Sequence, residues 1–246
     1  MSRILVTGSV DGLGRAAAEA LIDAGHDVIL HARNDRRASA FGALRDRAAG
    51  VVVGDLSVRD DVLAVISALT ASSPLDAVLH NAGVVDGAAV MPVNVVAPYL
   101  MTALLPAPHR HVYISSGMHR GGHVNVLDRV DWSGASVSGT YSDSKLFVTA
   151  LALAVARLRT NAIAHAVDPG WVPTKMGGPS ATDDLEAGHH TQEWLISSND
   201  PDATRSGGYW FHQQRQNPHP AVTNPGFQDR LLQALQAETG VVLTAS

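Results

Sequence analysis

The sequence predicts an α/β fold with one doubly wound, mostly parallel sheet of about seven strands and helices on both faces. Short apolar runs alternate with longer segments in which apolar residues recur at helical spacing. The first apolar run ends in a glycine-rich turn that opens a helical segment. The chain has 246 residues, the length of one large α/β domain, so we expect residues 1–246 to form a single domain.

The expected elements alternate along the chain. We expect strands at residues 4–6, 28–30, 51–53, 77–79, 112–114, 163–167 and 209–211. We expect helices at residues 13–24, 36–47, 58–69, 93–105, 141–158 and 228–237. The stretches 117–139 and 169–208 show no clear period. Loops of this length are usually functional, and both should lie near the carboxyl edge of the sheet, so we expect 171–208 to form a substrate lid.

Composition excludes several classes of function. The chain has no cysteine, which excludes disulfides, thiolate metal sites and a cysteine nucleophile. Its net charge is −5 and aromatic residues make up 5%, so we expect no nucleic-acid partner. No segment has the length of a membrane span or the form of a signal peptide, so we expect a cytoplasmic protein with no membrane partner. The 12 histidines form no convincing ligand set with acidic residues, so we expect no metal site.

The turn after the first strand has the composition of a dinucleotide site in a Rossmann-type fold. Its glycines at positions 8, 12 and 14 let the backbone turn sharply and approach a pyrophosphate. The helix that follows offers free N–H groups and a favourable dipole to the anion. An ordinary strand–helix turn is the alternative interpretation. The candidate cofactor residues of this turn are Gly8, Ser9, Asp11, Gly12, Leu13 and Gly14.

The end of the second strand bears on the choice of cofactor. Ala32 stands where an acidic residue would bind the adenosine ribose of NAD, and Arg33 follows it. A guanidinium suits a 2′-phosphate, so we expect NADP(H) to be preferred, with NAD(H) as the alternative. Asp11 would repel a 2′-phosphate if it pointed that way. Solvation of a helix start by Arg33, Arg36 and Arg37 is the other interpretation of these charges.

A tyrosine and a lysine carry the candidate chemistry. Tyr141 and Lys145 stand four positions apart in a helical segment, so they share one face. A nearby ammonium stabilises phenolate and lowers the pKa of tyrosine, which suits proton transfer with a carbonyl or alcohol oxygen. Ser115 and Ser116 end the fifth strand, where a hydroxyl would reach a substrate carbonyl, although turn-forming polar residues also occur there.

In this order the motifs resemble those of the short-chain dehydrogenase/reductase family. The matching motifs are TGxxxGxG at 7–14, NAG at 81–83, Asn94, the serine pair before Gly117, Tyr141 with Lys145, and Pro169-Gly170 with Thr174. The interval between Ser116 and Tyr141 is longer than is usual in the family. The insert and the possession of Arg33 are similar to the branch that contains retinol-dehydrogenase-like and WW-domain oxidoreductases.

The resemblance implies an NAD(P)-dependent oxidoreductase that transfers hydride between nicotinamide and a carbonyl or alcohol. It implies Tyr141 as general acid/base, Lys145 as the group that lowers its pKa and holds the nicotinamide ribose, and Ser116 as the group that polarises the carbonyl. Asn94 would support a water-linked proton relay to Lys145. The resemblance also places Tyr141 and Lys145 at the cofactor, together with Asp55, Leu56, Asn81, Ala82, Gly83, Pro169, Gly170, Val172 and Thr174.

Other functions fit the sequence less well. A serine hydrolase needs GxSxG after a strand, and Ser116 lacks the glycine two positions before it. A non-catalytic NADP-binding sensor of the same fold is the main alternative, although it has no need for Ser116, Tyr141 and Lys145 together. The identity of the small-molecule substrate is not readable. Helix 141–158 is apolar over more than one face, so a homodimer through it is expected as a candidate assembly.

Overall fold

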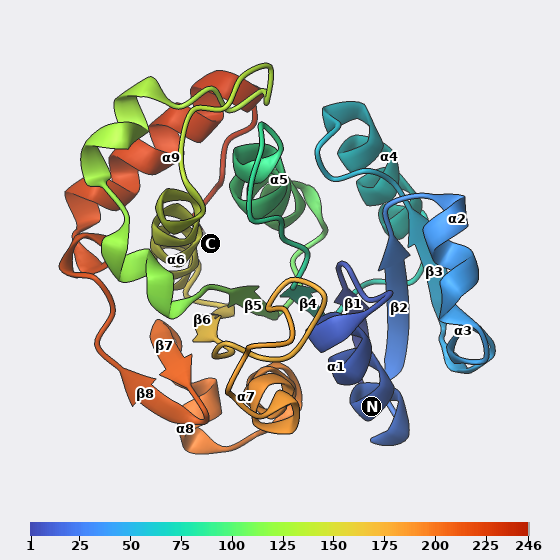
Figure 1. The fold of residues 1–246 in the computed structure, drawn as a ribbon. Coiled ribbons are helices and arrows are strands. Elements are labelled where there is room, and N and C mark those ends of the chain that lie inside the picture. The colour runs from blue at the N-terminus through green and yellow to red at the C-terminus, as the bar shows by residue number, and fades with distance from the viewer. Residues whose placement is uncertain (246) are drawn as a thin grey trace.

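A computed structural model describes residues 1–245, and its centre is one sheet of eight strands in the order β3-β2-β1-β4-β5-β6-β7-β8 (Figure 1). All seven expected strands form, and successive neighbours among them pair in parallel. The order reverses between β1 and β4, which is the switch point where doubly wound sheets bind ligands. The seven are β1 (Arg3–Val6), β2 (Asp27–Ala32), β3 (Gly50–Val53), β4 (Ala77–His80), β5 (Arg110–Ile114), β6 (Ile163–Asp168) and β7 (Gly208–Phe211).

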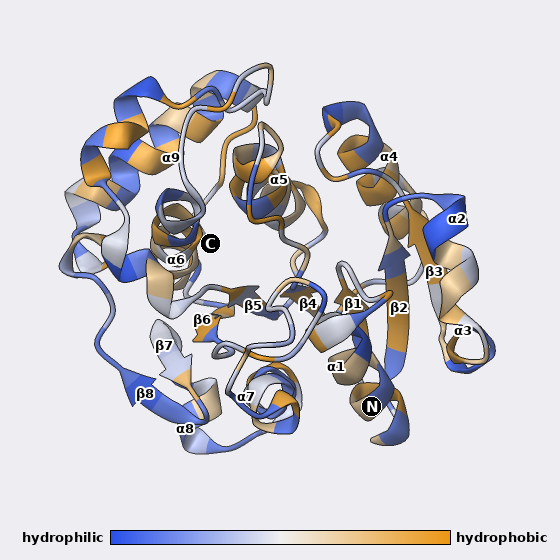
Figure 2. Cartoon of the chain, in the orientation of Figure 1, coloured by the Kyte–Doolittle hydropathy of each residue, from blue (hydrophilic) through white to orange (hydrophobic). Residues whose placement is uncertain are grey.

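The eighth strand, β8 (Gln214–Gln216), was not expected from the sequence. It pairs antiparallel with β7, and all three of its residues are exposed. All three are also polar, as the blue colour of β8 in Figure 2 shows. A solvent-exposed edge strand carries no apolar alternation, so its sequence gives no strand signal. The tight connection uses His212 and Gln213 at positive φ.

Helices cover both faces of the sheet (Figure 1). One face carries α1 (Gly12–Asp23) and α7 (Leu185–Ser197), which contact each other, and the short helices α2 (Asp35–Ala38), α3 (Leu44–Arg47) and α8 (Pro201–Thr204). The other face carries α4 (Arg59–Thr70), α5 (Ala97–Leu104), α6 (Tyr141–Leu158) and α9 (Pro225–Thr239). The short turns are η1 (Ser39–Phe41), η2 (Pro92–Val96), η3 (Gly117–Gly121), η4 (Val124–Arg129) and η5 (Pro220–Thr223).

Two expected helices are interrupted. The segment 36–47 forms α2, η1 and α3 rather than one helix, because Gly42 adopts φ 55°, a left-handed conformation that ends a helix. The segment 93–105 begins with a turn of π-helix, η2, before α5. The amide of Ala97 accordingly donates to the carbonyl of Pro92, five residues back. Isolated π-turns of this kind are frequent at functional sites.

The stretch 169–208 is less irregular than the sequence suggested. Its second half contains α7, which packs on α1 and on β4, β5 and β6. Gly188 and the neighbouring histidines break the apolar period of this helix, so it was not predicted. Because α7 packs on the sheet, we keep only the loop 171–184, at the carboxyl edge, as the candidate lid. The insert 117–139 likewise contains two short helices, η3 and η4.

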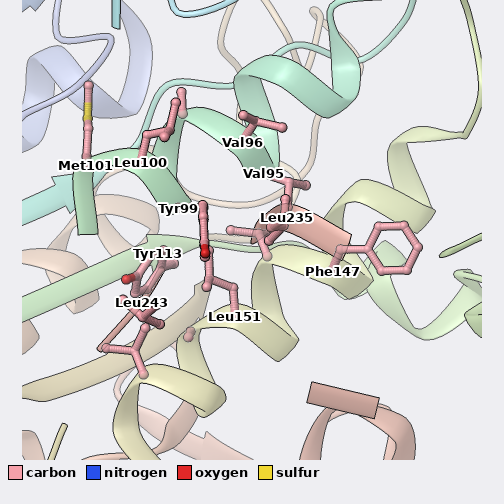
Figure 3. Packing of buried hydrophobic residues seen from close by; sticks show 14 of the residues in the cluster. Val95, Val96, Tyr99, Leu100, Met101, Tyr113, Phe147, Leu151, Leu235 and Leu243 are labelled. Atoms are coloured by element: carbon pink, nitrogen blue, oxygen red, sulfur yellow. The ribbon is translucent and has the colours of Figure 1, made fainter. Parts of the chain in front are cut away.

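Helix α9 completes the larger core. Figure 3 shows Leu235 of α9 and Leu243 among the buried side chains that surround α5 and α6. Arg157 of α6 donates to Gln228 at 2.7 Å and forms an ion pair with Asp229. The apolar residues of α6 that suggested a homodimer, among them Phe147 and Leu151, are therefore buried within one chain. The sequence argument for a homodimer through this helix does not hold.

None of the helices in residues 1–245 combines the length and the apolar surface that crossing a bilayer requires.

Candidate active site

The glycine turn after β1 leaves almost no room for side chains. Gly8 and Gly12 have φ of 65° and 55°, which favour glycine. A Cβ on Gly14 would lie 2.2 Å from Asn81 Nδ2 and 2.6 Å from the carbonyl oxygen of Gly8. A Cβ on Gly8 would lie 2.9 Å from the Cα of Ala82. The turn thus needs its glycines for packing against the end of β4 as well as for its conformation.

Side chains from β1 and β4 tie this turn to the sheet. Thr7 Oγ1 accepts hydrogen bonds from the amides of Asn81 and Ala82 at 2.9 and 3.0 Å. Asn81 Nδ2 donates to the carbonyls of Thr7 and Gly8 at 2.9 and 3.2 Å. The family resemblance implies that Asn81 and Ala82 border the cofactor. In the structure, both residues hold the glycine turn in place through hydrogen bonds to Thr7 and Gly8.

His31 fixes the turn from β2, a role that the sequence did not indicate. Its Nδ1 accepts from the amide of Gly8 at 3.0 Å, so its Nε2 carries the proton and donates to the carbonyl of Gly54 at 3.0 Å. The amide of His31 donates to Ser9 Oγ at 2.9 Å. His31 is buried, and this burial lowers its pKa, which keeps the ring neutral for both hydrogen bonds. Ser9 is likewise buried, and its hydroxyl hydrogen-bonds the backbone of His31 in β2.

The first turn of α1 presents the donor set that a pyrophosphate needs. Its N-cap residue, Asp11, makes no hydrogen bond to the helix from its side chain. The first N–H groups of the helix are therefore left for a ligand, and the helix dipole favours an anion there. The crowded glycine backbone around them gives a ligand close access. These residues fit a dinucleotide cofactor.

Two ion pairs flank the place where the adenosine end would lie. Arg37 Nη2 donates to Asp11 Oδ2 at 2.6 Å, so a cation already offsets the Asp11 charge. Arg33 Nε lies 3.9 Å from Asp55 Oδ2, and 59% of the Arg33 side chain is exposed. Asp55 Oδ1 accepts from both the amide and the hydroxyl of Ser57, which orders the turn after β3. Leu56 beside it is buried in the core.

The serine, tyrosine and lysine expected from the sequence meet at the end of β5. Ser115 points into the core, where its hydroxyl hydrogen-bonds Thr149 Oγ1 at 2.6 Å. Ser116 is half-buried, and its hydroxyl acts on the Tyr141 side chain by lowering the pKa of that phenol. Lys145 Nζ lies 5.4 Å from the centre of the Tyr141 ring and donates to the carbonyl of Ile114 at 2.6 Å. A capping box, in which Thr140 and Asp143 satisfy each other, sets the start of α6 and thereby the place of Tyr141.

Burial dominates the acidity of both residues. It raises the pKa of Tyr141 to about 12, although the hydrogen bond from Ser116 opposes this. The same effect lowers the pKa of Lys145 to about 8. The sequence led us to expect a lowered tyrosine pKa, but burial reverses that direction. The ammonium is itself destabilised by burial, and the negative charge of Asp168 further raises the tyrosine pKa.

Asn94 lies in the π-turn η2 and is buried. Its Oδ1 accepts from the amide of Val84 at 2.9 Å, and its Nδ2 donates to the Val84 carbonyl and to Ser144 Oγ, both at 2.9 Å. A Cβ on Gly83 would lie 3.3 Å from Asn94 Oδ1 and 3.6 Å from Lys145 Nζ. Gly83, Asn94 and Lys145 therefore lie close together. The side-chain amide of Asn94, however, hydrogen-bonds Val84 and Ser144 and not Lys145.

The loop after β6 returns to the glycine turn. A Cβ on Gly12 would lie 3.2 Å from the methyl group of Thr174, so this loop closes over the start of α1. Gly170 has φ 83°, and Val172 is buried against Gly188. Asp183 accepts from the amide of Trp171 at 2.6 Å and holds the two ends of the loop together. Pro169, Gly170, Val172 and Thr174 thus lie on the same edge as the glycine turn and Tyr141.

The sequence missed an acidic residue at this edge. Asp168 is the last residue of β6, and its Oδ2 accepts from the Tyr209 hydroxyl at 3.1 Å. A Cβ on Gly117 would lie 2.9 Å from the same oxygen, which places the carboxylate beside the Ser116 segment. The signal was available, because Asp168 directly precedes Pro169-Gly170 at the carboxyl end of a strand.

Several histidines have structural roles that the sequence left unassigned. His165 Nδ1 accepts from the amide of Gly208 and from Trp210 Nε1, both at 3.1 Å, and its Nε2 donates to the Ala203 carbonyl at 2.9 Å. His80 and His111 stack in the core at a centroid distance of 5.6 Å. Within residues 1–245, no three histidine, aspartate or glutamate side chains gather as a metal ligand set would.

Comparison with known proteins agrees with this geometry. The short chain dehydrogenase family model matches residues 2–185. The chain belongs to the short-chain dehydrogenase family.

This short-chain dehydrogenase is 37% identical to an uncharacterized oxidoreductase of Emericella nidulans, over 98% of each chain. It is 35% identical to a short-chain dehydrogenase of Penicillium rubens over the full length of both. It is also 31% identical to human retinol dehydrogenase 14, over 71% of this chain and 62% of the relative. The chain is therefore an NAD(P)-dependent oxidoreductase, as its motifs implied.

Solved structures share the fold. A protein of Mycobacterium paratuberculosis superposes with a TM-score of 0.77 at 22% identity, over 99% of this chain and 95% of the other. A short chain dehydrogenase of Shigella flexneri, solved in complex with NADP, has a TM-score of 0.68 at 22% identity. That comparison covers 87% of this short-chain dehydrogenase and 97% of the other chain. The Rossmann-type fold class expected from the sequence is confirmed, with one strand more than expected.

Proposed function

We propose that this short-chain dehydrogenase interconverts a carbonyl compound and its alcohol with NADP(H), using Tyr141 as general acid/base. The observation that carries the proposal is the meeting of Ser116, Tyr141 and Lys145 at the end of β5, on the sheet edge that also holds the glycine turn. The bound cofactor would supply or accept the hydride. The chain itself positions the carbonyl and handles the proton.

The cofactor would lie across the switch point of the sheet. The free N–H groups at the start of α1, within Gly8 to Gly14, would hold its pyrophosphate. Asp55 and Leu56 would border the adenine, and Asn81, Ala82 and Gly83 the ribose that follows β4. Pro169, Gly170, Val172 and Thr174 would border the nicotinamide end, with Tyr141 and Lys145 at its ribose. The convergence of these residues on one edge supports this assignment.

Each residue of the catalytic group would have a separate task. Ser116 would donate a hydrogen bond to the substrate oxygen and polarise it. Tyr141 would donate its proton to that oxygen in reduction and remove the proton in oxidation. Lys145 uses one N–H on Ile114 and keeps two donors for a ribose and a water. Asn94 would hold the Lys145 region in shape through Val84 and Ser144, and so support a proton relay to solvent.

The charges at the end of β2 support a preference for NADP(H) over NAD(H). Arg33 is largely exposed and only loosely paired with Asp55, so it is free to reach a 2′-phosphate. Asp11, which would otherwise repel that phosphate, is neutralised by Arg37.

The loop 171–184 is the part of the expected lid that remains a candidate. Trp171 and Met176 are about half exposed, at 52% and 49%, on the edge where substrate would enter. Because α9 covers α6 within the chain, we do not expect a homodimer through α6, and light scattering would show whether the protein forms a dimer through another surface. The cytoplasmic location stays a prediction from the sequence.

The decisive experiment is NADPH oxidation with a panel of ketones, aldehydes and quinones. Wild-type turnover is expected, and Tyr141→Phe should lower kcat by about three orders of magnitude while NADPH affinity stays within a few-fold. Near-normal turnover by Tyr141→Phe would contradict the role of Tyr141. If NADPH binds and no carbonyl is reduced, the protein is better described as an NADP-binding sensor.

A further inference from the structure

The carboxylate of Asp168 lies beside Gly117, the residue that follows Ser116 of the proposed catalytic group. Its charge is felt by both Tyr141 and Lys145. Asp168 is half-buried, so a ligand on this edge of the sheet has access to it. It comes directly before the Pro169-Gly170 turn that borders the cofactor site.

The protein satisfies only part of this carboxylate. Oδ1 accepts from the amide of Gly170 at 3.1 Å, and Oδ2 accepts from Tyr209 Oη at 3.1 Å. An ionised carboxylate has room for about four hydrogen bonds, so about two acceptor positions remain. Removing such a group from water is costly unless other donors replace the water.

No cation in residues 1–245 pairs with Asp168. Two cations of this region already donate to backbone carbonyls, although Lys145 keeps two free donors. Lys145 Nζ donates to the carbonyl of Ile114, and Arg120 Nη2 donates to the carbonyl of Asn217 at 2.9 Å. Arg120 touches Tyr209 instead, with its guanidinium 5.3 Å from the ring centre. Acceptor positions on the Asp168 carboxylate are therefore available to a donor on a ligand.

We propose that Asp168 determines substrate specificity by binding a hydrogen-bond donor next to the reacting carbonyl, and that it rejects substrates with a carboxylate at that position. This proposal rests on the proposed function, because it takes Ser116 and Tyr141 as the place of the carbonyl. A charge-assisted hydrogen bond to Asp168 would favour an amide N–H or a hydroxyl. A substrate carboxylate would meet a like charge in a partly dehydrated site.

A purely structural role is the competing explanation. Asp168 holds the turn at Gly170 and the hydroxyl of Tyr209, and both bonds would be lost or weakened in a large substitution. Asp168→Asn keeps the volume and an acceptor oxygen but removes the charge. A structural role therefore predicts equal effects on all substrates, whereas a specificity role predicts opposite effects on different substrates.

The test uses three matched aryl ketones with the full chain and NADPH. Benzoylformamide carries an N–H donor beside the ketone, methyl benzoylformate carries none, and benzoylformate carries a carboxylate. For the wild type we expect kcat/KM for the amide to exceed that for the ester about tenfold, and that for the carboxylate about a hundredfold. In Asp168→Asn the advantage over the ester should fall to a few-fold, and the carboxylate should gain about tenfold or more.

The matched control is Asp202→Asn. Asp202 is an exposed residue of α8, which precedes β7 and lies at the opposite edge of the sheet, so this variant removes the same charge far from the site. Its three kcat/KM ratios should equal those of the wild type. If Asp168→Asn lowers all three substrates by one common factor, Asp168 only positions the turn and the proposal is overturned.

A binding measurement separates this proposal from the proposed function. Mandelamide and mandelate, the corresponding alcohols, are titrated by calorimetry into the chain loaded with NADP⁺. Tighter binding of mandelamide in the wild type, abolished in Asp168→Asn, supports the specificity role even if no ketone is turned over. Equal binding of both alcohols, or binding of neither, overturns it. Reduction of the ketones without discrimination would leave the proposed function standing.

Discussion

The two halves of the carboxyl edge of the sheet use their polar groups in different ways. On the side of β1 and β2, the buried side chains of Thr7, Ser9 and His31 are all bonded to backbone groups of the same site. On the side of β5 and β6, Asp168 keeps free acceptor positions. Large apolar side chains are also exposed there, with Met118 of η3 at 57% and Trp171 at 52%.

This difference indicates how the site divides its work. A network that is satisfied before the ligand arrives fixes the backbone, and a rigid backbone suits a ligand that is always the same. Free acceptor positions and exposed apolar side chains at a site are available to a ligand, so we expect specificity to reside on this side. Substitutions on the first side should therefore affect mainly folding and cofactor affinity, whereas substitutions of Asp168 and the exposed apolar residues on the second should affect mainly the choice and turnover of substrate.

The largest expected effect is that of Gly14→Ala. The new Cβ would collide with Asn81 Nδ2 and the Gly8 carbonyl, so we expect a loss of about 3 kcal/mol in the free energy of unfolding. NADPH binding should weaken more than a hundredfold, because the turn must move. Thermal unfolding and fluorescence titration measure the two quantities. Gly121→Ala on the other side has no atom within 4 Å of its Cβ, so it should change neither.

Thr7→Val should have the next largest effect. It keeps the shape of the side chain but leaves the amide of Ala82 without an acceptor and the amide of Asn81 with only the Leu79 carbonyl, which costs about 2 kcal/mol of stability. Chemical denaturation measures this loss. Met118→Ala, an exposed position on the other side, should stay within about 0.5 kcal/mol of the wild type. Equal losses in the two variants would remove the distinction between the two halves.

Arg33→Ala tests the boundary of the cofactor half. We expect NADPH affinity to fall about tenfold and NADH affinity to stay the same, because a charged hydrogen bond to the 2′-phosphate is lost. Arg36 is an exposed neighbour of equal charge, so Arg36→Ala is the control for a general loss of positive charge in this region. Calorimetry with both cofactors gives the ratio. If only Arg37→Ala lowers NADPH affinity, the 2′-phosphate is held at the Asp11–Arg37 pair instead.

The smallest effect is on the pH profile of Asp168→Asn. Asp168 raises the pKa of Tyr141, so the loss of its charge should lower that pKa. Reduction requires the protonated tyrosine, and its rate declines as pH rises through this pKa. The alkaline decline of kcat should therefore move to lower pH, by about one pH unit at most. A shift in the opposite direction would show that Asp168 and Tyr141 are not coupled as the structure indicates.

The sequence predicted the helices and strands whose apolar residues recur at a regular spacing, and it did not predict those that lack such a spacing. The helix expected at 141–158 has those bounds in the structure, because its apolar residues and its capping box agree. Strand β8 and helix α7 gave no signal, since one is polar throughout and the other contains Gly188 and adjacent histidines. The break at Gly42 depends on a backbone conformation that no period reveals.

The site was predictable where a residue acts through its type and spacing. The glycine turn, Ser116, Tyr141 and Lys145 are of this kind. His31 is not, because it acts through Gly8 and Gly54, which are far away in the sequence. The position of Asp168 at the end of a strand could have indicated a site residue, but its contact with Tyr209 could not be predicted. The direction of the Tyr141 pKa was wrong for a similar reason. The effect of burial on an ionisable group depends on the packing of the whole site.

The position of α9 over α6 has a consequence for how the chain folds. Tyr99 Oη donates to the carbonyl of Val241 at 2.6 Å, a contact between residues 142 positions apart. Such distant contacts form late, since the chain must close a long loop before it gains them. Until residues 225–243 pack against α6, Phe147, Leu151 and their neighbours are exposed to water, and such exposed apolar surface promotes aggregation of incompletely folded chains. The nascent protein should therefore depend on chaperones most heavily just before its C-terminal helix docks.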